Sequence, residues 1–123
     1  MLTGSCHCGK TAFEIDGAIP DKLTRCTCSI CAKKGALYAY YEPAQFRLRS
    51  PVADEATYRW RTRQVAHNFC PSCGCATYTD SPKFAPDHSW DGKSRRIGVN
   101  ARLLDDFDAA EWPVAVIDGK NLW

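Results

Sequence analysis

Hydrophobic and polar positions alternate in short runs along the chain, and this period of two predicts β-strands. Within residues 10–16, for example, Thr11, Phe13 and Ile15 fall on one side of the predicted strand. Further runs rich in aromatic or β-branched residues predict strands at residues 36–42, 45–50, 56–62, 64–69, 75–79 and 95–101. No segment shows ten residues of clear helical period. The sequence therefore predicts a mainly β domain.

The segment between the last two predicted strands has no such alternation. Residues 80–93 are rich in proline, aspartate and glycine, which favour turns, so we expect a long loop there. Loops of that length either shape a functional site or are simple excursions on the surface, and both interpretations stay open at this point.

Length and composition indicate one globular domain. A chain of 123 residues can bury a real hydrophobic core, and we expect a single domain over residues 1–123. Hydrophobic residues make up 45% and charged residues 24%, which excludes wholesale disorder. No apolar run reaches the ~20 residues of a membrane-spanning helix, and the N-terminus lacks a signal-peptide pattern. The expected protein has no membrane partner and is cytoplasmic.

The charge distribution gives little support to a nucleic-acid surface. The net charge is +2, and the densest basic group is "RWRTR" at residues 59–63. In a β-strand, Arg59, Arg61 and Arg63 would share one face. A solvated strand face is the simpler interpretation of this pattern, and nucleic acid is an unlikely partner.

Cysteine carries the strongest chemical signal. Without an export signal, eight cysteines favour metal binding over four disulfides. They are clustered at positions 6 and 8, at 26, 28 and 31, and at 70, 73 and 75. Gaps of one or two residues let neighbouring thiolates reach one zinc ion at about 2.3 Å each.

Two of these clusters together supply four ligands. Cys6, Cys8, Cys70 and Cys73 would close an all-thiolate tetrahedron that clips the start of the chain to its middle, and we expect a structural zinc there. In "FCPSCG", Gly74 permits the turn with positive φ that such a knuckle needs. By analogy with zinc-finger peptides, this zinc would contribute on the order of 10 kcal/mol to folding.

The remaining cluster is one ligand short. Cys26, Cys28 and Cys31 would hold zinc through three protein ligands and leave one position for a substrate, which is the arrangement of a catalytic zinc. Alternatively, Cys75 is the fourth ligand, and the chain holds two closed structural zincs without chemistry. Cys75 lies two residues from Cys73, however, and we expect it to be a spare buried thiol.

The motifs of this chain, in their order, resemble a known family. "GSCHCGKTAFEI", "CTCSICAKKGALYAYY", "FRLRS", "ATYRW", "HNFCPSCGCATY" and "VNARLLDDFD" are similar to the glutathione-dependent formaldehyde-activating enzymes, which share their domain with centromere protein V. The resemblance spans about residues 3–108. It implies a small zinc-stapled β-sheet domain of the β-tent type, with a structural zinc at the four-cysteine set and a second zinc at the set of three where glutathione is placed.

The resemblance also implies a reaction. Glutathione and formaldehyde would join as S-hydroxymethylglutathione, or separate again, which is carbon-sulfur lyase chemistry. A thiol bound to zinc is deprotonated, so two zinc ions and glutathione are the expected cofactor and substrate set. Three thiolates weaken zinc as a Lewis acid, and this favours binding of the substrate sulfur over binding of the aldehyde oxygen. The alternatives are a non-catalytic glutathione or small-thiol binding protein, and an interaction module for nucleic acid or protein.

Glutathione has two carboxylates, which need cations nearby. Arg25, Lys33 and Lys34 flank the three-cysteine cluster and are candidates by adjacency, although ordinary exposed charges would look the same. His7 is expected to be exposed. His67 and His88 have the right chemistry for proton carriers, but their spacing ties neither to the cluster.

Overall fold

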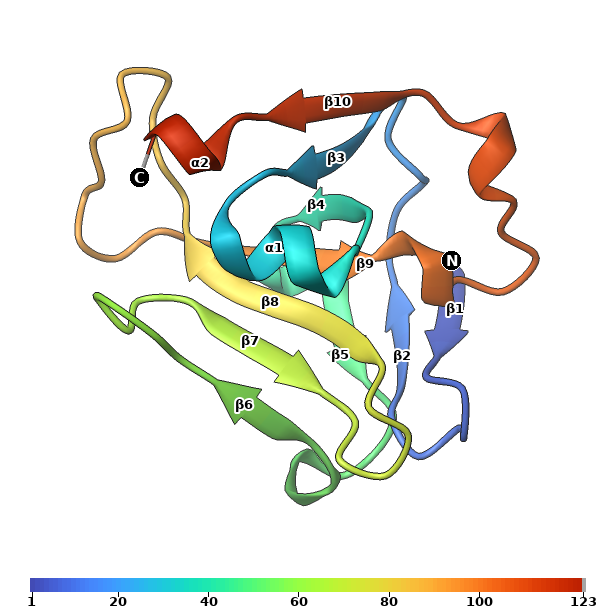
Figure 1. The fold of residues 1–123 in the computed structure, drawn as a ribbon. Helices are drawn as coiled ribbons and strands as arrows, with labels where there is room; N and C mark the ends of the chain where they lie inside the picture. Colours follow the sequence, from blue (N-terminus) through green and yellow to red (C-terminus); the bar gives the residue numbers. More distant parts are fainter. Residues whose placement is uncertain (123) are drawn as a thin grey trace.

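The computed structural model describes residues 1–122 as two β-sheets with few and short helices (Figure 1). The strands are β1 (Leu2–Ser5), β2 (Ala12–Ile15), β3 (Leu23–Cys26), β4 (Tyr38–Tyr41), β5 (Phe46–Leu48), β6 (Ala56–Tyr58), β7 (Ala66–Phe69), β8 (Ala76–Pro82), β9 (Arg95–Asn100) and β10 (Val114–Ile117). The helices are α1 (Ser29–Lys34), α2 (Gly119–Leu122) and the 3-10 turns η1 (Pro43–Gln45), η2 (Val52–Asp54), η3 (Ala101–Leu103) and η4 (Ala109–Glu111). The predicted mainly β class is confirmed.

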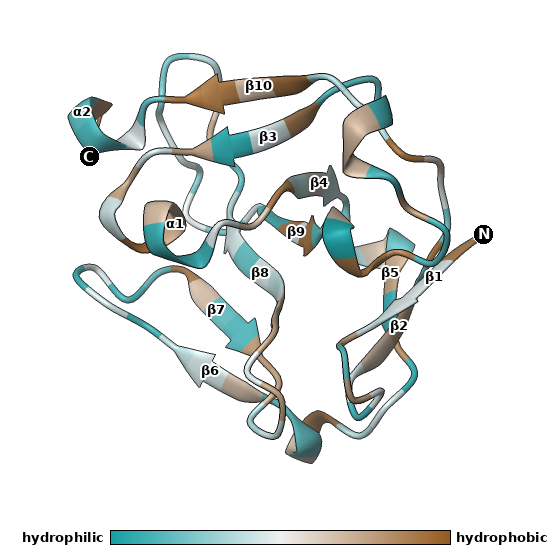
Figure 2. Cartoon of the chain, turned by 45° about the vertical axis from the view of Figure 1, so that its right-hand side comes forward, coloured by the Kyte–Doolittle hydropathy of each residue, from teal (hydrophilic) through white to brown (hydrophobic). Residues whose placement is uncertain are grey.

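The two sheets differ in size and share the core. The smaller sheet has the order β1-β2-β5, and the larger has the order β10-β3-β4-β9-β8-β7-β6. All pairs are antiparallel except β10 with β3, which run parallel. In both views α1 lies between β3 and β7 (Figure 1 and Figure 2). The helix that carries Cys31 is therefore held over the larger sheet.

The hydrophobic core joins the two sheets. Phe13 and Ile15 of β2 are fully buried, as is Thr11 beside them, so the predicted alternation of this strand is confirmed. The ring centroids of Phe46 in β5 and Tyr78 in β8 lie 4.6 Å apart, and this contact connects the smaller sheet to the larger one.

The seven predicted strands all exist, with shifted ends. Each observed strand starts one or two residues inside the predicted range, except β6 and β9, which start where the prediction does. The prediction for residues 75–79 was too short, because β8 continues through Pro82, where it pairs with Arg95 of β9. The long loop is correspondingly shorter than predicted and occupies residues 83–94.

The prediction that Arg59, Arg61 and Arg63 share a strand face is wrong. Strand β6 ends at Tyr58, and the chain then turns, because Arg61 and Arg63 have φ of 52° and 60°. The amide of Arg63 donates to the carbonyl of Trp60 at 2.9 Å and closes this turn. The basic residues therefore form the tip of the β6–β7 connection and no flat basic surface.

Three strands lacked a strong sequence signal. β1 and β3 are four residues long, and no clear alternation marks them: the one buried residue of β1 is Gly4, and β3 has two buried residues. β10 has the sequence VAVI and appears hydrophobic in Figure 2, yet its side chains are mostly exposed. This strand was not predicted from the sequence, although its β-branched residues favour one. Within residues 1–122, no helix is long and apolar enough to cross a membrane.

Gly98 of β9 determines how two tyrosines lie over the larger sheet. A Cβ at this position would lie 2.6 Å from Oγ1 of Thr79, 2.9 Å from the ring of Tyr40 and 3.2 Å from that of Tyr38. Tyr40 and Thr79 are its partners on the two neighbouring strands, so both lean over the glycine. The absence of a side chain at Gly98 is what permits this packing.

We expect Gly98→Ala to lower the free energy of unfolding by about 1–3 kcal/mol, because the added methyl group overpacks this site. Denaturant titration measures the loss, and near-UV circular dichroism reports the displaced tyrosine rings. Gly92→Ala is the control, since nothing lies within 4 Å of a Cβ there and only its positive φ of 82° adds strain. A Gly98→Ala protein with unchanged stability and an unchanged near-UV spectrum would contradict the packing argument.

Candidate metal and thiol site

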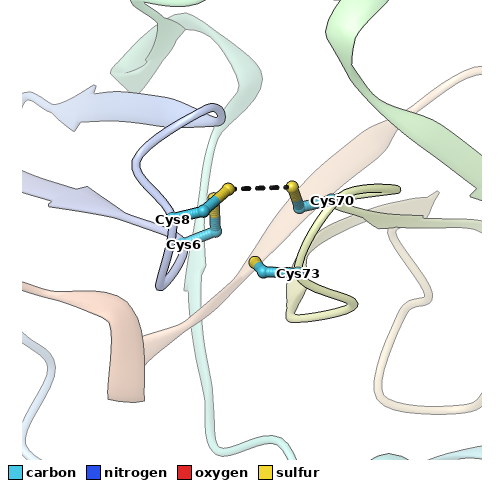
Figure 3. Close-up of side chains that lie close together, drawn as sticks. All are labelled: Cys6, Cys8, Cys70 and Cys73. Carbon is cyan, nitrogen blue, oxygen red and sulfur yellow. Dashed lines mark hydrogen bonds between the residues drawn. The ribbon is translucent and has the colours of Figure 1, made fainter.

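Four cysteine sulfurs from two distant turns lie together (Figure 3). Cys6 and Cys8 follow β1, whereas Cys70 and Cys73 occupy the turn between β7 and β8. All four sulfurs lie within 4.8 Å of one another. The Sγ atom of Cys8 is 3.7 Å from that of Cys6 and 3.6 Å from that of Cys70. The structure thus brings together Cys6, Cys8, Cys70 and Cys73, for which the sequence predicts a structural zinc. We call these residues the four-cysteine group.

The sulfur geometry fits zinc. A tetrahedron with Zn–S bonds of about 2.3 Å has edges of about 3.8 Å, close to the two sulfur–sulfur distances above. Backbone amides also stabilise thiolates here: the N–H groups of Cys75 and Cys8 lower the pKa of Cys73 to about 5. The amide of Thr11 donates to the sulfur of Cys6 at 3.3 Å.

The turn between β7 and β8 has the predicted glycine conformation. Gly74 has φ of 80°, and its amide donates to the carbonyl of Cys70 at 2.8 Å. This hydrogen bond closes the turn that carries Cys70 and Cys73. The prediction for Gly74 is confirmed.

The second group contains three cysteines. Cys26 ends β3, Cys28 is the N-cap of α1, and Cys31 lies in its first turn. The i, i+3 spacing places Cys28 and Cys31 on one side of the helix, and all three sulfurs lie within 4.8 Å of one another. The amide of Cys28 donates to the sulfur of Cys26 at 3.4 Å. We call Cys26, Cys28 and Cys31 the three-cysteine group.

Cys75 belongs to neither group among the described residues, so the alternative that made it the fourth ligand of the three-cysteine group has no support in the geometry. Its side chain is half-buried, and the prediction of a buried thiol was therefore too strong. The backbone of Cys75 instead serves the four-cysteine group, because its amide stabilises Cys73 and its carbonyl accepts from the amide of Cys70 at 3.0 Å.

A cavity of about 320 Å³ lies beside α1, the helix that carries Cys31, and Ile30 and Lys34 of this helix line it. It lies between α1, strand β7 and the turn of the four-cysteine group, and its wall includes Ile30, Lys34, Tyr58, His67, Phe69 and Gly74. Most of this wall is apolar. The polar groups in it are consequently well placed to orient a small ligand.

Lys34 and His67 meet at this cavity although they are 33 residues apart. Nζ of Lys34 donates to the hydroxyl of Tyr38 at 2.6 Å and lies 3.1 Å from Nδ1 of His67. Since an ammonium only donates, Nδ1 of His67 is the acceptor and the ring proton is on Nε2. We call Lys34, Tyr38 and His67 the lysine cluster. Adjacency to the cysteines suggested Lys34, but no spacing in the sequence pointed to Tyr38 or His67.

Burial and the neighbouring charged groups shift the pKa values of the three residues in the lysine cluster. Burial, followed by the charge of Lys34, lowers the pKa of His67 to about 4, so this imidazole is neutral near pH 7. Burial lowers the pKa of Lys34 as well, and thiolates at Cys31 and Cys28 would oppose this change. Burial raises the pKa of Cys31 to about 12, so this thiol needs a bound metal to ionise near pH 7. Burial and then the charge of Cys31 raise the pKa of Tyr38, whose hydroxyl stays protonated.

The other candidates from the sequence lie elsewhere. Arg25 and Lys33 are exposed, and so are His7, as predicted, and His88, which lies in the long loop. A second cavity of about 380 Å³ is lined by Thr27 and Ser29, which flank Cys28 in the chain, and by Trp60, Arg61 and Lys120.

Comparison with known proteins identifies the family. The family described as "Glutathione-dependent formaldehyde-activating enzyme" matches residues 1–112. The chain belongs to this family. The resemblance inferred from the cysteine motifs is thereby confirmed for the glutathione-dependent formaldehyde-activating enzymes.

Two relatives extend this comparison. A protein of Halomonas elongata named "Putative glutathione-dependent formaldehyde-activating enzyme" is 48% identical over 33 residues, which are 27% of this chain and 21% of that protein. The match therefore spans about a fifth of that relative. A crystal structure of a Rhodobacter sphaeroides protein superposes with a TM-score of 0.73 at 25% identity, covering 92% of this chain and 99% of the other.

We expect His67 to make stability depend on pH. Its folded-state pKa of about 4 lies below the ordinary value of about 6.5, so the unfolded chain takes up the proton first. The stabilisation is present above pH 6.5 and is lost as the pH falls toward 4, by at most about 1.4 kcal/mol per pH unit. Denaturant titrations between pH 7.5 and 5.5 measure this slope, which we expect to be shallower in His67→Gln.

His88→Gln is the matched control, because His88 is exposed, and it keeps the wild-type slope. All three proteins have the same cysteines, so any loss of metal at low pH is common to them. Equal slopes for wild type and His67→Gln would show that His67 is not held neutral by the fold.

Proposed function

We propose that this chain is a zinc-dependent carbon-sulfur lyase that forms or cleaves S-hydroxymethylglutathione. The sulfur of glutathione would complete the coordination that Cys26, Cys28 and Cys31 begin. A second zinc at Cys6, Cys8, Cys70 and Cys73 would be structural. The expected partners are a small thiol and an aldehyde.

The observation that carries this proposal is the difference between the two cysteine groups. One offers four sulfurs within 4.8 Å of one another, whereas the other offers three, on and before a helix whose Ile30 and Lys34 line a cavity. A structural zinc takes four protein ligands, and a catalytic zinc takes three and leaves one position for the substrate. Membership of the glutathione-dependent formaldehyde-activating enzymes supports glutathione and formaldehyde as the substrates.

The proposed reaction needs a thiolate and no redox partner. Zinc would keep the substrate thiol deprotonated near neutral pH. The sulfur electron pair forms the C–S bond, the carbonyl π pair moves to the aldehyde oxygen, and that oxygen takes up the proton that the thiol has lost. The protein would hold the thiol in place and limit access of water through the largely apolar wall of the cavity.

The ligand set predicts metal content. Purified protein is expected to carry two zinc ions per chain, and Cys28→Ser to lose one while the fold remains. Cys73→Ser is expected to unfold or to become insoluble, because a structural zinc contributes on the order of 10 kcal/mol. Elemental analysis and circular dichroism measure both effects, and Cys75→Ser, which alters a thiol outside both groups, keeps two ions. One zinc in the wild type, or collapse of Cys28→Ser, contradicts this ligand assignment.

The reaction itself is testable by NMR exchange spectroscopy. We expect the wild type to accelerate exchange between glutathione plus formaldehyde and S-hydroxymethylglutathione, and Cys28→Ser to return it to the uncatalysed rate. Cys75→Ser is the control that keeps the activity. Parity of the wild type with the uncatalysed reaction excludes this reaction, and binding of glutathione without faster exchange would indicate a non-catalytic thiol-binding protein.

A further inference from the structure

The cavity beside α1 holds a cation without an acidic partner. Lys34 is half-buried in its wall, and none of the residues that line this cavity is an aspartate or a glutamate. Among the ion pairs of residues 1–122, none includes Lys34. A charge that has lost part of its water in this way costs free energy unless an anion lies close to it.

The lysine cluster fixes the direction of the Lys34 ammonium. This group has three N–H bonds, of which one points to the Tyr38 hydroxyl and one to Nδ1 of His67. The remaining N–H bond is thus presented from a fixed position in the wall of the cavity.

We propose that Lys34 binds a carboxylate of the thiol substrate in this cavity, with Tyr38 and His67 as positioning residues. The inference rests on the proposed function, because it takes the substrate sulfur to lie at the three-cysteine group. Lys34 follows Cys31 by three residues on α1, so the two side chains lie on one side of the helix. Along the helix axis these residues are less than one turn apart, and one turn is about 5.4 Å.

A carboxylate accounts for the cavity better than compensation of the cysteine charge alone. Compensation requires only that a lysine lies near the sulfurs, and the exposed Lys33 or Arg25 would serve without being buried. Lys34 instead lies in a wall that is otherwise mostly apolar, held from two strands, β4 and β7. Such a fixed cation in an apolar pocket selects ligands that carry an anion at a set distance from the thiol.

The test compares two ligands with the same thiol. Isothermal titration calorimetry on zinc-loaded protein measures the affinity for glutathione and for glutathione diethyl ester, in which both carboxylates are blocked. We expect Lys34→Met to weaken glutathione binding by about 10- to 100-fold, the loss of a charge-assisted hydrogen bond. Its affinity for the diethyl ester stays within about twofold of the wild type. His67→Phe, which leaves Lys34 held by Tyr38 alone, weakens glutathione binding in the same selective way.

Lys33→Met is the matched control, because it removes the same charge from the exposed position next to Lys34 and is expected to bind both ligands like the wild type. Zinc content, measured on every variant, verifies that the three-cysteine group is intact. Equal weakening of both ligands in Lys34→Met would show that Lys34 acts on the sulfur charge, which overturns the proposal. A wild type that binds neither ligand would refute the proposed function itself, and the inference with it.

Discussion

The contact between sulfurs 62 residues apart is the constraint on which the arrangement of the two sheets depends. Cys8 extends from the smaller sheet and Cys70 from the larger, and their sulfurs are 3.6 Å apart. Four thiols this close together cannot all ionise without a metal, because neighbouring thiolates repel one another. The amide of Lys10 favours the thiolate of Cys8, but burial and the sulfurs of Cys70, Cys6 and Cys73 outweigh it and raise the pKa of Cys8 to about 11. A dication bound here would allow all four thiols to ionise and would join the two sheets through its four ligands.

The four-cysteine group also shapes the cavity in which we place the substrate. Gly74 belongs to the turn of the four-cysteine group and at the same time lines the cavity beside α1. Ile30 and Lys34 of α1, the helix that carries Cys31, line the same cavity. A metal at the four-cysteine group would consequently fix part of the wall of this cavity, and the two cysteine groups would then be coupled mechanically although they share no ligand.

Prediction from sequence succeeded where the relevant contacts are local. Alternation at Phe13 and Ile15 and the glycine turn at Gly74 depend on neighbouring residues, and both were predictable. Cysteine spacing and the family resemblance also grouped the thiols correctly. The encounter of Lys34 with His67 depends on the pairing of β7 with β8 and on where α1 packs, which no local pattern encodes. The arginine turn was missed because its positive φ values occur at residues that rarely adopt them.

The C-terminal segment supports the three-cysteine group from outside residues 1–112, which match the family. The family match ends at residue 112, whereas β10 begins at Val114 and pairs with β3 up to Cys26. The amide of Thr27 then donates to the carbonyl of Ile117 at 3.0 Å, and its hydroxyl to Asp118 at 2.8 Å. Without β10, strand β3 would be an edge of the sheet, and the loop between Cys26 and Cys28 would lose these hydrogen bonds. In this chain, the position of two of the three sulfurs thus depends on residues beyond the family match.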